Sequence, residues 1–256
     1  QQWRTKAILA KALSAENYLI KQQKEDNTEE DTNSEYTEHI QKLEKLIQSG
    51  GFEAARGGLK ALVSIYEKYY TDPNKHAELE EKIKTSWTKL PAVERLKLIE
   101  EIAQISLDNK DPDKALEYIE TGWKIVNSDK WPVRYRIPLS ARLISLKYRA
   151  GRPEQARADA DELIALFELD RDKITDIYRS ETLLPLAETY QTMGQSQTSL
   201  DIYRKAVEES TINGNSRPCA IDLSRACSSM AASDLKPDKE LMTRIKQIKD
   251  GLSKPW

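Results

Sequence analysis

The sequence predicts an all-α protein built as an α-solenoid, an array of antiparallel helix hairpins. Three observations support this prediction. Charged residues make up 32% of the 256 residues, and only nine glycines and ten prolines supply turns, too few for an all-β fold. Apolar residues recur at three- and four-residue steps, whereas strict alternation over five or more residues is hard to find. Similar segments also return along the chain, which is the signature of a repeat architecture.

The expected elements begin with an N-terminal helix over residues 1–24. Residues 25–38 hold seven acidic residues and no basic one, so we expect a solvated, mobile loop there; an acidic docking tail is the alternative. Helical repeats are expected over 39–215. A pair of capping helices, whose residues match the pattern of the repeats poorly, is expected over 216–256.

Glycine and proline divide the repeat region into helices. Pro112 and Pro153 each stand at a predicted first helical position, where the missing N–H costs nothing. Gly151 ends the helix that precedes Pro153. A kink or a late helix start is predicted at two prolines inside helical patterns, Pro138 and Pro185.

The segment 183–206 contains a spaced set of bulky, small and aromatic residues. They are Leu183, Leu186, Ala187, Tyr190, Gly194, Ser199, Tyr203 and Ala206. This set resembles the tetratricopeptide repeat (TPR), in which small side chains let the two helices of a hairpin approach closely and bulky ones fill the gap beside them. The resemblance implies a right-handed solenoid of helix hairpins.

Weaker copies of the pattern lie over 144–163, 99–122 and 43–62. The small-residue sites Ala115, Ala156 and Ser199 are 41 and 43 residues apart, whereas the family period is about 34. The longer period implies helices about one turn longer or longer connections, and HEAT-like repeats are the alternative fold. The wider gap between the first two copies predicts one more helix, near 75–88.

No recognisable catalytic, metal-binding or phosphate-binding motif is present. The two histidines, His39 and His76, belong to no HExxH motif and no Cys/His cluster, so no zinc site is expected. Neither a phosphate-binding loop of the GxxxxGK[ST] type nor a GxSxG nucleophile turn occurs. We therefore expect a protein that is not an enzyme and that holds no cofactor or metal.

A run of basic residues stands out over 130–152, which contains seven Lys and Arg side chains and no acidic one. Arg134, Arg142 and Arg149 are spaced by eight and seven residues, which predicts one shared helix face with Tyr135 near it. By position this is the first helix of its hairpin, and the resemblance implies that first helices line a concave groove. These four residues are the candidate binding site for an acidic peptide, a chain-terminal carboxylate or a phosphate. In the alternative interpretation the arginines are neutralised by acids of neighbouring repeats, for instance Asp161, Asp176 or Glu181.

The sequence thus predicts a non-catalytic scaffold that binds a peptide or protein partner through the groove. Two alternatives stay open: an RNA- or polyanion-binding solenoid, and a helical module of a larger sensor or enzyme. The 40 basic and 42 acidic residues nearly balance, which counts against a nucleic-acid partner. No apolar run approaches the ~18 to 20 residues of a membrane span. The oligomeric state is not predicted.

The chain starts at Gln1 without a methionine, which leaves two locations open. If Gln1 is a mature start left after removal of a secretion signal, we expect an exported, periplasmic protein. If Gln1 is a trimmed start, we expect a cytoplasmic protein.

Overall fold

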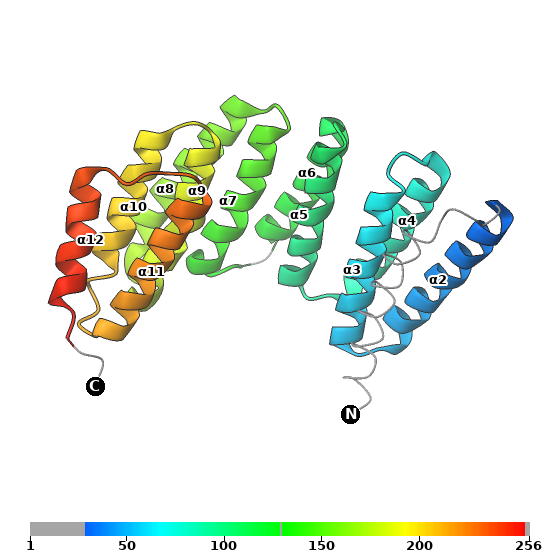
Figure 1. Cartoon of the computed structure of the whole chain (residues 1–256), viewed down its shortest axis with the longest axis horizontal. Helices are drawn as coiled ribbons and strands as arrows, with labels where there is room; N and C mark the ends of the chain where they lie inside the picture. The colour runs from blue at the N-terminus through cyan, green and yellow to red at the C-terminus, as the bar shows by residue number, and fades with distance from the viewer. Residues whose placement is uncertain (1–28, 129, 254–256) are drawn as a thin grey trace. The chain divides into compact units, whose positions relative to one another are not determined.

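A computed structural model describes residues 29–128 and 130–253 of the chain. This part is all-α, with eleven α-helices, two short 3-10 helices and no strand (Figure 1). The α-helices are α2 (Glu29–Ser49), α3 (Phe52–Lys68), α4 (Pro73–Ser86), α5 (Ala92–Asp108), α6 (Pro112–Ser128), α7 (Val133–Arg149), α8 (Pro153–Asp170), α9 (Asp176–Thr192), α10 (Ser196–Glu209), α11 (Ser216–Ala232) and α12 (Lys239–Gly251). The 3-10 helices are η1 (Trp87–Lys89) and η2 (Arg171–Lys173). The all-α prediction is confirmed, and α4 is the additional helix expected near 75–88.

The loop predicted over 25–38 is wrong from Glu29 onward, because α2 begins there. The run of acidic residues is compatible both with a solvated loop and with the start of a helix. Acidic residues favour solvent, but they also suit the first turns of a helix, whose N-terminus carries a partial positive charge. The N-terminal helix predicted over 1–24 lies outside the described residues, as do residues 25–28.

Proline marks helix starts as predicted at Pro112 and Pro153. The late starts considered for Pro138 and Pro185 are not found, because α7 begins at Val133 and α9 begins before its own proline. Each of these two prolines therefore lies inside a continuous helix, where it removes one intrahelical hydrogen bond.

The chain divides into two compact units, one ending at Ile105 and one starting at Ser106. In the first unit α3 packs against α2 and α4. Gly58 of α3 meets Ile47 of α2 so closely that an added Cβ would lie 2.6 Å from Cγ1 of Ile47. Glycine is required there because any larger side chain would push the two helices apart.

The second unit stacks helix hairpins side by side. Its first helices α7 and α9 pack against each other and α11 packs on α9, while α8 and α10 pack as the second helices of their hairpins (Figure 1). The core between the two rows includes the fully buried rings of Phe167, Tyr190 and Tyr203. All eight residues of the 183–206 pattern except the turn glycine are buried.

The repeat period is visible in the backbone itself. Lys110, Gly151, Gly194 and Asp234 have positive φ values of 62°, 81°, 73° and 50°, and each follows the end of a first helix, α5, α7, α9 or α11. In every case the next residue donates its N–H to the carbonyl five residues back, at 2.9 to 3.2 Å. This is the Schellman helix ending. The four turns are 41, 43 and 40 residues apart, so the period near 42 predicted from the small-residue sites is a property of the fold.

Candidate functional site

The basic run predicted as a binding face lies on α7 and on the segment that precedes it. Tyr135, Arg142 and Arg149 are exposed on α7, and Arg134 is half-buried. The apolar residues of the same helix face the core, where Ile137 and Ile144 are fully buried. The exposed residues of the basic run and the buried apolar residues therefore lie on different faces of α7.

The three predicted arginines do not converge on one point. Arg134 lies against α9, whereas Arg149 pairs with Asp108 at the end of α5, with 3.5 Å between the guanidinium nitrogen and Oδ1. Fifteen helical residues separate the two arginines, which is about 22 Å along the axis. One small anion cannot contact both side chains, so only an extended ligand could span this face.

Arg134 is held by two tyrosines. Its guanidinium carbon lies 4.5 Å from the ring centroid of Tyr135 and 4.7 Å from that of Tyr178 on α9. Its Nη2 also donates a 2.6 Å hydrogen bond to the hydroxyl of Tyr135. Both rings remain partly exposed, at 46% and 37%. The contacts fix the guanidinium by cation–π attraction and one hydrogen bond.

Sequence reasoning missed Tyr178, although the repeat register could have found it. Tyr135 and Tyr178 each lie sixteen residues before the left-handed glycine that ends their hairpin's first helix, Gly151 and Gly194. Equivalent positions on successive first helices become neighbours when the hairpins stack. Aligning the turns rather than the consensus residues therefore places the two rings side by side.

The acids considered as neutralising partners each contact a different residue. Asp161 accepts a 2.5 Å hydrogen bond from the hydroxyl of Tyr190, and Asp176 accepts a 3.1 Å bond from Asn213. Glu181 pairs with Arg225 of α11. Neutralisation does occur within the run, but through other acids: Lys147 pairs with Asp159 and Arg149 with Asp108.

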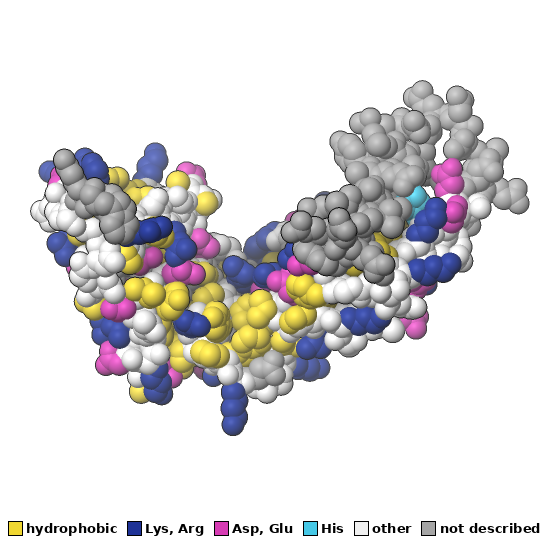
Figure 2. All heavy atoms as spheres, turned by 90° about the horizontal axis from the view of Figure 1, so that it is seen from below, with side chains coloured by type: hydrophobic (Ala, Val, Ile, Leu, Met, Phe, Trp, Pro, Cys, Tyr) yellow, Lys and Arg dark blue, Asp and Glu magenta, His cyan; other side chains and the backbone are white. Residues whose placement is uncertain are grey.

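Three cations at the start of α7 have no ion pair with any described residue: Lys130, Arg134 and Arg136. Together with Tyr135 and Tyr178 we call them the α7 cluster. On the face of the second unit seen in Figure 2, hydrophobic side chains gather and Lys and Arg side chains lie around them. The α7 cluster combines cations that have no ion pair with a described residue and two partly exposed tyrosine rings.

The neighbouring face between α9 and α11 has a different character. Glu188 accepts a 2.5 Å hydrogen bond from Ser229, whose hydroxyl also lies 2.6 Å from that of Tyr203. Asp222 is buried on α11, and burial, with a smaller effect from Glu181, raises its pKa to about 6 against the attraction of Arg225. Glu188, Ser229 and Tyr203 thus satisfy one another within the chain, whereas the cations of the α7 cluster have no ion pair with a described residue.

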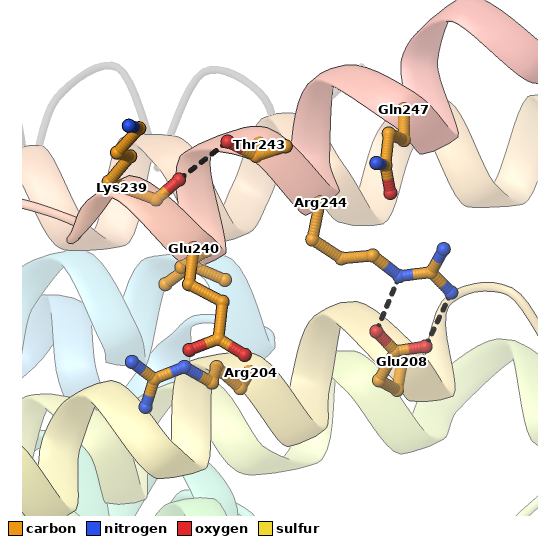
Figure 3. Close-up of a pocket in the computed structure, with 8 residues that line it drawn as sticks. Arg204, Glu208, Lys239, Glu240, Thr243, Arg244 and Gln247 are labelled. Carbon is orange, nitrogen blue, oxygen red and sulfur yellow. Dashed lines mark hydrogen bonds and ion pairs between the residues drawn. The ribbon is translucent and has the colours of Figure 1, made fainter.

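A separate cavity of about 630 Å³ lies between α10 and α12 (Figure 3). Arg244 binds Glu208 across it through two hydrogen bonds of 2.6 and 2.7 Å, and this contact lowers the pKa of Glu208. Lys239 and Glu240 also line the cavity, so its charges largely balance. The cavity lies in the row of second helices and includes none of the predicted site residues.

Among residues 29–128 and 130–253, no group of three or more His, Cys, Asp or Glu side chains is arranged to hold a metal ion. No helix in the same part of the chain has the length and apolar character needed to cross a membrane.

Comparisons with known proteins give a limited result. No protein-family model matches the sequence, and no curated protein matches it either. Two solved structures are similar, both of nearly identical TPR-like repeats from a Podosopora anserina protein assigned to the kinesin light chains, one of them a point variant. They share 16% and 18% identity with this chain, cover 75% and 76% of it and 93% and 97% of their own length, and give TM-scores of 0.42 and 0.41. The evidence for the hairpin fold of this chain is the helix pairs and turns described above.

Proposed function

We propose that this chain is a non-catalytic scaffold that binds an extended peptide segment of a protein partner along the first-helix face of α7. The observation that carries the proposal is the α7 cluster, because three cations without an ion pair to any described residue stand beside two exposed rings. Exposed aromatic and Arg side chains are the residue types that dominate the binding energy of protein interfaces.

Two further features support a protein partner over a polyanion. The basic surface is local, since the acidic side chains Glu181 and Glu188 follow on α9. The whole chain is also nearly neutral, with a formal charge of −2. A nucleic acid needs a continuous basic path for its phosphates, whereas a short acidic peptide needs only a local one.

The test compares capture of a partner by the wild type and by the triple variant Arg134→Glu, Arg142→Glu, Arg149→Glu. The matched control is Lys124→Glu, Lys246→Glu, Lys249→Glu, which makes the same change in net charge at exposed positions of the second helices α6 and α12. Circular dichroism checks that all three proteins stay helical. A protein captured by the wild type and the control but lost by the α7 variant supports the proposal once the purified pair binds directly.

Equal capture by all three proteins would overturn the proposal and leave these arginines as structural side chains. If the captured molecule is RNA, and the logarithm of its binding constant falls linearly with log[salt] with a slope corresponding to several phosphates, the polyanion alternative replaces the proposal. A captured partner that contacts neither the α7 residues nor the control residues would favour the alternative in which the chain is a helical module of a larger sensor or enzyme.

A further inference from the structure

We infer that Arg134, clamped between Tyr135 and Tyr178, is the anchor of the α7 face and that it takes a carboxylate side chain of the partner segment. This inference rests on the proposed function and names the chemistry that the same face recognises. It goes beyond the predicted arginine row, because it assigns the recognition to one side chain and adds Tyr178 as the residue that positions it.

The geometry favours a planar anion. A guanidinium that lies against ring faces presents its N–H donors at its edge, in a fork that matches a carboxylate in two parallel hydrogen bonds. Nη2 of Arg134 donates a hydrogen bond to Tyr135. The other N–H donors of Arg134 contact no acceptor among residues 29–128 and 130–253, so they are available at the surface.

The clamp also reduces the entropic cost of binding. A free Arg side chain must give up several rotamers when it pairs with a ligand. Contacts with two rings from two different helices hold Arg134 before the ligand arrives. A lysine at this position would keep the charge but lose the planar fork and most of the stacking.

Charge around the clamp selects an acidic segment. Lys130 and Arg136 lie four residues before and two residues after Arg134 in the sequence, and both are exposed. Asp176, two residues before Tyr178, is engaged by Asn213 at Oδ2 and by the backbone N–H of Ile177 at Oδ1, 2.7 Å away. The nearby acid is therefore committed to local structure. A segment with several Glu or Asp residues fits three uncompensated cations, and the exposed parts of the two rings can pack against its aliphatic stems.

The probe is an acetylated, amidated hexaglutamate peptide with a fluorescent label, measured by fluorescence anisotropy against hexaglutamine of the same design. We expect the wild type to bind hexaglutamate and not hexaglutamine. Arg134→Lys should weaken binding about tenfold although it keeps the charge, because the planar fork is lost. Tyr178→Ala should weaken it by a similar factor, while Tyr178→Phe should stay near the wild type because the ring face is kept.

Arg136→Gln is the matched control, since it removes one neighbouring positive charge without touching the clamp. We expect a loss of about twofold for this variant, as for a screened surface charge. No binding of hexaglutamate by the wild type, equal affinity for wild type and Arg134→Lys, or equal losses for Arg134→Gln and Arg136→Gln would each overturn the inference. Tighter binding of inorganic phosphate than of the peptide, measured by competition, would also overturn it in favour of a phosphate site.

The anchor role of Arg134 and the proposed scaffold function are contradicted by different results. If the charge-reversed triple variant loses the captured partner while Arg134→Lys keeps it, the scaffold proposal stands and the anchor is wrong. If the triple variant keeps the partner while the hexaglutamate series behaves as expected, the clamp binds acidic peptides and the scaffold proposal is wrong.

Discussion

The hydroxyl of Ser199 on α10 donates a 2.8 Å hydrogen bond to the backbone carbonyl of Ala187 on α9. Both residues are fully buried. They occupy two of the small-residue sites of the 183–206 pattern, so the contact shows what those two sites do in this chain. A side chain on one helix touches the backbone of the other, which is possible only when the helices are close together.

Substitution of Ser199 should therefore be more costly as the side chain grows. Ser199→Ala loses one buried hydrogen bond, for which we expect about 1 kcal/mol of lost unfolding free energy. Ser199→Leu forces the hairpin apart, and we expect about 3 kcal/mol. Urea unfolding followed by circular dichroism measures both. Ser224→Leu, at an exposed site on α11, is the control and should cost about 0.5 kcal/mol or less; equal costs at the two sites would contradict the close-contact argument.

Much of the fold could be predicted because equivalent positions in successive repeats pack in the same way. All consensus positions of 183–206 except the turn glycine are buried in α9 and α10, and Lys110 stands where the pattern requires a turn residue. The start of α2 could not be predicted, because an acidic run suits both a solvated loop and a helix N-terminus. Apolar periodicity sets in only after this run, so it gave no signal at Glu29.

The candidate site was predictable only in part. Arg134 and Tyr135 follow from the basic run, and their exposure depends on the helix face alone. The contact with Tyr178 depends on how α7 stacks on α9, which is a relation between residues 44 positions apart. The ion pair of Arg149 with Asp108 has the same origin. Sequence periodicity shows which residues share a face, but the partners of those residues come from packing.

Gly151 and Lys110, which both have a positive φ at the end of a helix, should respond in opposite ways to substitution. Gly151→Ala places a Cβ at φ 81°, and we expect about 1 kcal/mol of destabilisation from backbone strain alone, because no atom lies within 4 Å of the added carbon. Lys110→Gly relieves the same strain at φ 62°, and we expect stabilisation of up to about 1 kcal/mol. Gly214→Ala also has open space but no positive φ, so it serves as the control. Thermal unfolding should place Lys110→Gly highest, the control Gly214→Ala in the middle and Gly151→Ala lowest, and a stabilising Gly151→Ala would contradict the turn assignment.

The ion pair between Arg171 and Glu209 joins the turn before α9 to the end of α10. Glu209 is buried and accepts hydrogen bonds of 2.6 and 3.0 Å from Arg171. We expect Arg171→Met to cost about 3 kcal/mol, because it leaves a buried carboxylate without its bidentate partner. The double variant Arg171→Met, Glu209→Leu should recover most of this loss, since it removes the buried charge as well. A double-mutant cycle in urea measures the coupling, and additive losses would show that the pair does not act as a unit.

The raised pKa of Asp222 predicts a pH dependence of stability with a definite sign. Its pKa is about 6 in the folded chain, chiefly through burial, and about 4 in an unfolded chain, so the folded state binds the proton more strongly between these values. Stability should therefore fall as the pH rises from about 4 to about 6, and the cost should stay constant above that range. Asp222→Asn removes the cost because its side chain stays neutral.

The measurement is the difference in unfolding free energy between Asp222→Asn and the wild type at several pH values. We expect the difference to be near zero at pH 4 and to grow to on the order of 2 kcal/mol in favour of the variant at pH 7. Asp250→Asn, at an exposed position on α12, is the control for the substitution itself. A pH-independent difference for Asp222→Asn would mean that Arg225, 3.8 Å from the carboxylate, compensates the burial in full.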